Sequence, residues 1–318
     1  MAKAFASTAD LTEKRVSFEE LAPGIHAFTA EGDPNSGVVV GERGVLVFDA
    51  QATPKQARRV IERIRTVTDR PVRYVVLSHY HAVRVLGASA YGAEEIVASS
   101  GTRHLIEERG EQDFASEVGR FPRLFEDVEG IPGLTWPTQW FDRRLVIDLG
   151  DRRVELLHLG RGHTAGDIVA WMPEERVVFA GDLVEYGATP YTGDAHLRDW
   201  PRTLDRLAEL GAEKLVPGRG AAATTPAEVG EAIAMTRAFL TDLFGIVEAG
   251  VKAGRSLKEV YDEAVARMRP KYGHWVIFEH CMPFDVTRAY DEASGIDWPR
   301  IWTHERDLEM WRRLEGGD

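Results

Sequence analysis

Short apolar runs rich in β-branched residues recur along the first two thirds of the chain, and each ends at a loop of polar residues and glycine. Residues 24–30, 36–50 and 71–81 read as strands, and GERG splits the second of them into a hairpin. Residues 53–67 read as a helix, because a proline stands near the start and apolar residues recur at helical spacing. The run that ends at SHYH is apolar enough for a strand buried on both faces. This part of the chain is therefore predicted to be β-β-β-α-β.

The alternation of strands and helices continues towards residue 224. The expected elements are strand 94–100, a mostly helical segment 101–128, loop 129–142, hairpin 144–160, two strands within 160–184, helix 199–211 and strand 213–220. A sheet must bury one face against another layer, so we expect the two halves to stack sheet on sheet with helices outside. The fold class is therefore α/β.

The sequence pattern changes near Thr225 from alternating strands and helices to helices alone. Residues 225–254 and 256–268 read as amphipathic helices, with Ser256 as the N-cap of the second. We expect an N-terminal arm over 1–19, a main domain over 20–224 and a C-terminal helical extension over 225–318. The long first helix is interpreted as a packing helix or as the face of a homodimer.

Composition narrows the class of partner. The formal net charge of −12 argues against binding to nucleic acid or to an anionic membrane surface. Cys281 is the single cysteine, so neither an intramolecular disulfide nor a cysteine-rich zinc site can form. No segment resembles the apolar core of a signal peptide or the roughly 18 apolar residues of a membrane span. We therefore expect a soluble, cytoplasmic protein that acts on a small molecule.

Three loops at the ends of expected strands carry residues that can bind a metal. His79 and His81 stand two apart in SHYHAVR, where an extended backbone projects both to the same side. His163 lies in GRGHTAGD, and Asp182 follows the strand that ends in FAG. Three imidazoles and one carboxylate suit zinc or another divalent first-row metal.

The segments SHYHAVRVLG, GHTAGD and FAGDLV, preceded by NSGVVVGERGVLVFDA, resemble the metallo-β-lactamase-fold superfamily over about residues 20–222. The resemblance implies an αββα sandwich that often holds two metal ions. By the family's pattern, His79, His81 and His163 match the ligands of the first metal. Asp182 matches the carboxylate that bridges the two ions.

The chain departs from the family's H-x-H-x-D-H and G-H-G motifs at three positions. Val83 and Arg84 replace the Asp and His of the first motif, and Arg219 replaces the His of the second. Valine cannot coordinate a metal, and arginine stays protonated and only donates. We therefore expect one divalent ion. The two guanidinium groups are predicted to supply positive charge to the site, where they neutralise Asp182 or hold an anionic group of the substrate.

Two chemistries are compatible with this residue set. In the first, zinc activates a water that hydrolyses a small ester, thioester or lactone, and Asp182 is the fourth ligand or the base. In the second, His79, His163 and Asp182 form the facial triad of a mononuclear iron(II) oxygenase, as in family members that resemble persulfide dioxygenases. We prefer the hydrolase, because hydrolysis is the commoner activity in the superfamily. A third interpretation is a metal-poor, non-catalytic binding or partner protein.

Several further residues have two interpretations each. Asp49 either supports the site loops, as its counterpart does in the family, or only caps a turn. His274 and His280 either fill the core or line a substrate pocket that the C-terminal helices cover. Tyr191 and His196 lie in a loop that either lines the pocket or is exposed.

Overall fold

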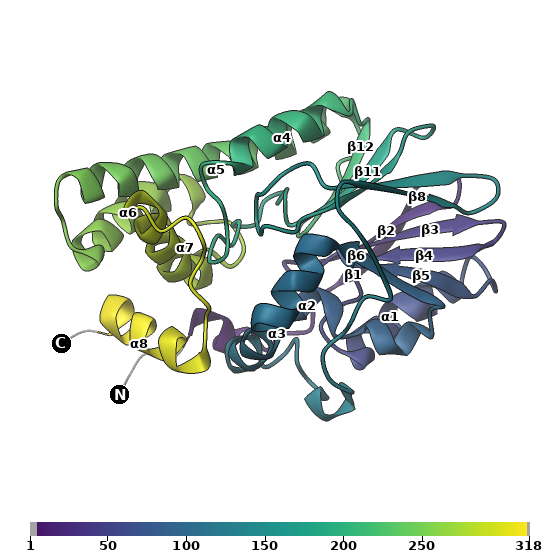
Figure 1. Cartoon of the computed structure of the whole chain (residues 1–318), viewed down its shortest axis with the longest axis horizontal. Coiled ribbons are helices and arrows are strands. Elements are labelled where there is room, and N and C mark those ends of the chain that lie inside the picture. The colour runs from purple at the N-terminus through teal and green to yellow at the C-terminus, as the bar shows by residue number, and fades with distance from the viewer. Residues whose placement is uncertain (1–4, 317–318) are drawn as a thin grey trace.

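Two β-sheets lie face to face in the computed structural model, which describes residues 5–316, and helices cover their outer sides (Figure 1). The first sheet has seven strands in sequential order: β1 Val16–Ala22, β2 Ile25–Ala30, β3 Ser36–Gly41, β4 Gly44–Phe48, β5 Val72–Val76, β6 Glu95–Ser99 and β7 Gln139–Phe141. The second has five strands in the order β12-β11-β10-β9-β8: β8 Arg144–Asp148, β9 Arg153–Leu157, β10 Val169–Met172, β11 Val177–Gly181 and β12 Lys214–Pro217. The αββα sandwich is thereby confirmed.

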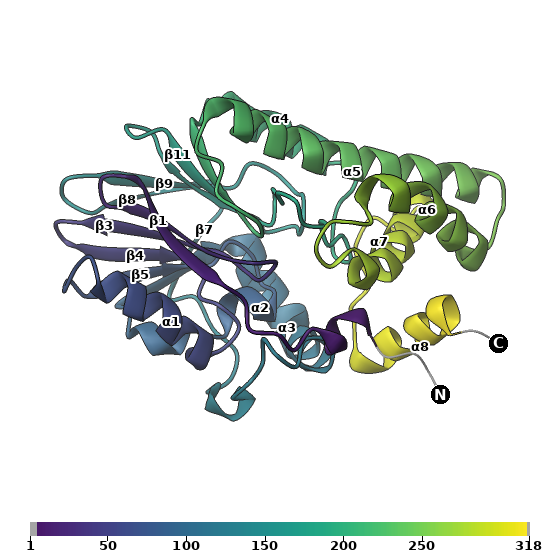
Figure 2. The ribbon, with the colours of Figure 1, turned by 180° about the vertical axis from the view of Figure 1, so that it is seen from behind.

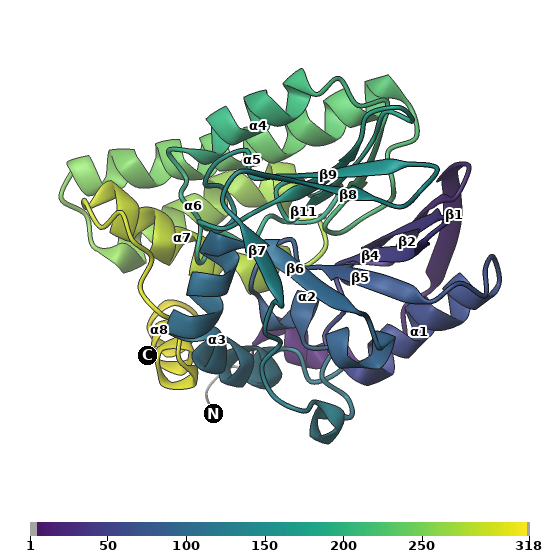
Figure 3. The same cartoon turned by 45° about the vertical axis from the view of Figure 1, so that its right-hand side comes forward.

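The strand patterns explain this stacking. Every residue of β4 and β11 is buried, as expected for β-branched strands with a layer on each face. Phe48 of β4 meets Phe179 of β11 between the sheets, with ring centroids 5.9 Å apart. Figure 3 shows the two sheets edge on, with α1 (Pro54–Arg65) below the first and α4 (Trp200–Glu209) above the second.

The other helices lie mainly at one end of the sandwich (Figure 1). They are α2 Ala82–Val85, α3 Ser100–Arg120, α5 Pro226–Lys252, α6 Leu257–Tyr272, α7 Phe278–Ala293 and α8 His304–Glu315, with short 3-10 turns η1 Ala6–Ala9, η2 Ala88–Tyr91 and η3 Val128–Gly130. Both α5 and α6 begin with a capping box, in which a Thr or Ser side chain and a Glu three residues later satisfy the first backbone N–H groups. α5 begins where the C-terminal extension was expected. Among the described residues, no helix has the length and hydropathy needed to cross a membrane.

Two local expectations need correction. The arm expected over 1–19 overlaps the first sheet, because β1 pairs with β2 from Val16 onward, and Phe5 packs on the aromatic residues of α7 and α8. The loop expected over 129–142 contains β7, which adds an edge strand to the first sheet. The segment 101–128 is mostly helical, as expected, and α3 ends at Arg120 because the residue before Pro122 avoids the helical region.

Candidate metal centre

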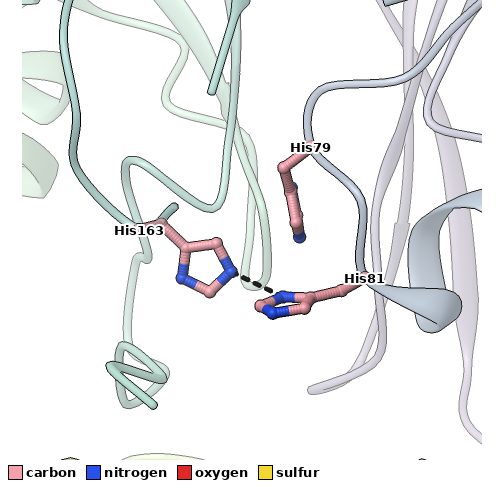
Figure 4. A group of neighbouring side chains, drawn as sticks. All are labelled: His79, His81 and His163. Carbon is pink, nitrogen blue, oxygen red and sulfur yellow. Dashed lines mark hydrogen bonds between the residues drawn. The ribbon is translucent and has the colours of Figure 1, made fainter. Parts of the chain in front are cut away.

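Three histidines converge at the end of the sandwich that faces the C-terminal helices. His79 and His81 follow β5, and His163 lies in the loop between β9 and β10 (Figure 4). One ring nitrogen of each lies within 4.8 Å of the others, and the three side chains are at most 2% exposed. The structure therefore brings together the three imidazoles that the motifs single out.

The outer nitrogen of His79 is held by a relay through Ser78. Ser78 donates its hydroxyl to Asp49 Oδ2 at 2.8 Å, so its oxygen is left to accept from His79 Nδ1 at 2.8 Å. The backbone N–H of Ser78 also donates to Asp49. Asp49 thus reaches the site through Ser78, which goes beyond the capping of a turn.

The other two histidines are held in the same way. His163 Nδ1 lies 2.8 Å from the carbonyl oxygen of Tyr191, which can only accept. His81 Nε2 lies 3.2 Å from Asp194 Oδ2, and Arg109 holds the second oxygen of that carboxylate. Asp194 was not singled out from the sequence, and it has no spacing relation to His81 that would have revealed it.

These outer bonds leave a lone pair on each inner nitrogen. His79 Nε2 has no hydrogen-bond partner among residues 5–316, although it is buried. His81 Nδ1 and His163 Nε2 face each other at 2.9 Å, where two lone pairs repel unless a proton or a cation lies between them. An imidazole with its far nitrogen bound to an acceptor and its near nitrogen free is the usual state of a metal ligand. The residues present therefore fit a divalent ion.

The pKa values of His79 and His163 agree with this interpretation. Burial holds the pKa of His79 well below its ordinary value and lowers that of His163 to about 3, so both rings are neutral. Burial also disfavours charge on His81, but Asp113 and Asp194 outweigh it and raise its pKa to about 9. A proton on His81 would lie between the two facing nitrogens, and it would have to leave before a divalent ion binds there.

Asp182 lies beside the histidines at the end of β11. Its Oδ2 atom is 3.9 Å from His79 Nε2 and 3.7 Å from His163 Nε2. Burial favours the neutral acid, but Arg84, the two imidazoles and Arg219 hold the pKa of Asp182 far below its usual range. The carboxylate therefore stays ionised.

Both arginines that replace family ligands contact Asp182. Arg84 is fully buried, pairs with Asp182 and donates to the carbonyl oxygens of Asn35 at 3.1 Å and Gly218 at 2.8 Å. A Cβ at position 218 would stand 2.3 Å from Asp182 Oδ1, so only glycine lets this loop approach so closely. The buried ion pair with Asp182 is compatible with the predicted neutralising role of Arg84.

Arg219 is placed differently from Arg84. Its Nη1 atom lies 3.3 Å from Asp182 Oδ2 and 3.2 Å from Glu185 Oε1, and the side chain borders a small cavity beside the histidines. Glu185 was not singled out from the sequence. Its burial, together with the nearby charge of Asp182, raises its pKa to about 8, so Arg219 faces one ionised and one largely neutral carboxyl group.

The same cavity lies between His81, His163 and Asp182 on one side and the start of α7 on the other. Tyr191 and His280 line this cavity, which agrees with the interpretation that places them at a pocket. His274 is exposed, and His196 is buried; neither borders this cavity.

Comparison with known proteins gives one family match. Residues 29–219 match the family model described as the metallo-beta-lactamase superfamily. A type 2 metallo-beta-lactamase of Bacillus cereus is 24% identical over 201 residues, which are 61% of this chain and 70% of that protein. A linear primary-alkylsulfatase of Pseudomonas sp. is 23% identical over 232 residues, which are 63% of this chain but only 44% of that protein.

Solved structures extend the comparison to the fold. A metallo-beta-lactamase from Pontibacter korlensis has a TM-score of 0.57 at 20% identity and covers 71% of this chain and 99% of its own. A stereoselective inverting sec-alkylsulfatase from Pseudomonas sp. has a TM-score of 0.70 at 15% identity, over 87% of this chain and 50% of its own. A share of 87% cannot be accommodated before Thr225, so the second likeness extends into the C-terminal helices.

Proposed function

The chain belongs to the metallo-β-lactamase superfamily, and from that premise we propose that it is a hydrolase that uses one divalent metal ion. His79, His81 and His163 hold the ion, and zinc is the first expectation. One observation carries the proposal: each imidazole has its outer nitrogen bound to an acceptor or hydroxyl and turns its inner nitrogen to a common point. Arg84 lies buried against Asp182, where the family's second ion would need a ligand.

Asp182 and Arg219 have proposed roles beside the metal ion. A divalent ion bound here supplies acidity, lowering the pKa of a water towards ~7 and polarising the substrate. Asp182 Oδ2 accepts a hydrogen bond from the attacking water or completes the ligand set. A carboxylate whose pKa is held this low is a weak base, so orientation suits Asp182 better than proton abstraction. Arg219 borders the cavity and can stabilise negative charge that develops on the substrate.

The substrate class we propose is a small ester, thioester or lactone, with an anionic group as an option that Arg219 favours. Sulfate esters belong in the same set, because the likeness to an alkylsulfatase extends into the C-terminal helices that cover the site. Cleavage of nucleic acid is disfavoured by the net charge of −12.

Metal analysis followed by a substrate panel tests this function. Protein purified without added metal should contain about one equivalent of zinc and should hydrolyse at least one of 4-nitrophenyl acetate, 4-nitrophenyl sulfate, a thioester and a lactone. Chelation or His163→Ala should abolish both metal and turnover, whereas His274→Ala, at an exposed position away from the cavity, should change neither.

The other outcomes identify the alternatives. Bound iron with oxygen consumption would favour the oxygenase with the His79, His163 and Asp182 triad. Substoichiometric metal, with no effect of His163→Ala on any property, would favour a non-catalytic partner protein.

A further inference from the structure

Two neighbouring cavities lie between the surface and the histidines. The outer one, about 350 Å³ in volume, lies between the N-terminal segment, the end of α3 and the start of α7. The N-terminal segment passes from the sheets along α3 towards α8 in Figure 2, so it forms one wall. Four residues border both the outer cavity and the small inner one: Phe121, Arg219, Ile277 and His280. A molecule that reaches the metal centre by this path passes between them.

His280 is fixed in one tautomer at this junction. Ser7 donates its hydroxyl to the carbonyl oxygen of Arg120 at 2.5 Å, so the Ser7 oxygen accepts from His280 Nδ1 at 2.8 Å. His280 Nε2 therefore carries a lone pair. It has no hydrogen-bond partner within residues 5–316, although the side chain is only 2% exposed.

The neutral state of His280 has a physical cause. Burial, with the charges of Arg120 and Arg219, holds its pKa well below the ordinary value. A buried acceptor without a donor is destabilising. A bound molecule that donates a hydrogen bond to His280 Nε2 would therefore stabilise this part of the structure.

The backbone beside His280 is also strained. Ile277 begins α7 with φ of +59°, a left-handed conformation that a β-branched residue seldom adopts. Strain of this kind persists where the surrounding structure enforces it, and it is concentrated at binding sites. Here it places the first turn of α7, and with it His280, at the junction.

We propose that His280 recognises the substrate by accepting, at Nε2, a hydrogen bond from an O–H or N–H group of the molecule in the outer cavity. Trp275, Leu124 and Phe278 give that cavity an apolar wall, which suits the carbon body of such a molecule. The inference rests on the proposed function only in calling this molecule the substrate; the binding site itself does not depend on turnover.

Two small probes separate the hydrogen bond from general apolar binding. Benzyl alcohol has the donor, and benzyl methyl ether has a similar body without it. In NMR titrations of the zinc-loaded full chain, the alcohol should bind roughly three- to tenfold more tightly, as one neutral hydrogen bond gives. His280→Phe should remove this preference, and His280→Gln, which keeps an acceptor, should retain part of it. His274→Phe is the matched control on an exposed histidine and should leave the preference unchanged.

Each outcome decides the proposal. Equal binding of the two probes, binding of neither, or a preference that survives in His280→Phe would overturn the proposal. If that variant does not fold, an undiminished preference in His280→Leu, which also lacks an acceptor, has the same force. A preference that depends on His280, in a protein that hydrolyses nothing in the ester panel, would keep the recognition site and reject the proposed function. Hydrolysis without the preference would do the reverse.

Discussion

Replacing Arg84 by methionine removes the buried charge that neutralises Asp182 while keeping most of the side-chain volume. The variant loses one ion pair and the two donors to the carbonyl oxygens of Asn35 and Gly218. Breaking a buried ion pair on one side costs about 3–5 kcal/mol. Because Arg219 remains 3.3 Å from Asp182, we expect the lower end of that range. At roughly 1.5 °C per kcal/mol for a chain of 318 residues, the melting temperature should fall by about 4–5 °C.

The loss should be smaller when metal is bound. A divalent ion at the histidines lies near Asp182 and compensates its charge in the absence of Arg84. By linkage, whatever stability the ion restores must appear as tighter binding of the ion by Arg84→Met. Urea denaturation with excess zinc and with a chelator measures the stability that the ion restores. Chelator competition measures the zinc affinity, and the two results should agree.

The pH dependence has a definite sign. The pKa of Asp182 in the folded protein lies below the ~3.9 of an unfolded aspartate, so the stabilisation is present above that pH and is lost as pH falls towards the folded value. The gap between wild type and Arg84→Met should therefore narrow in acid. Arg144→Met removes an exposed arginine of β8 and should change stability by no more than about 1 kcal/mol. Equal destabilisation with and without zinc, at unchanged zinc affinity, would refute the neutralising role of Arg84.

Three further predictions test other parts of the site. Asp194→Asn should weaken zinc binding about 10- to 100-fold, measured by chelator competition, because the imidazole it supports loses its carboxylate acceptor. Glu185 keeps a proton in the folded state up to a pH of about 8, whereas the unfolded chain releases it above the ordinary pKa of 4.5. The chelator-treated protein should therefore lose stability as pH rises towards about 8. Glu185→Gln should flatten this decline in denaturation curves, and an unchanged slope would contradict the raised pKa of Glu185. Val83→Asp, Arg84→His and Arg219→His together should raise zinc content from one to two equivalents by elemental analysis, and a content that stays at one would show that arginine is not what excludes the second ion.

The strands and the three histidines were predictable because their signals are local. β-branched runs specify strands, and loops at neighbouring strand ends bring their side chains to one edge of a sandwich. Asp194 and His280 reach the site by contacts across long sequence separations: 113 residues between Asp194 and His81, and 273 between His280 and Ser7. No periodicity encodes such contacts, since they depend on how the C-terminal helices and the N-terminal segment settle on the sandwich. For His280, the sequence therefore left two interpretations open, a core residue or a residue that lines a substrate pocket.

Arginine in place of a second metal changes what the site can do as well as how it is charged. A second dication would offer positions for water or substrate oxygen, whereas a guanidinium only donates hydrogen bonds and never releases its proton under physiological conditions. Arg84 and Arg219 therefore retain the electrostatic contribution of the missing ion and give up its ability to activate a nucleophile. In the proposed hydrolase, the nucleophile would then be generated at the histidines, on the side of Asp182 that faces His79 and His163. The positive charge around Asp182 is built into the chain, so it is present before any metal binds and does not vary with metal supply.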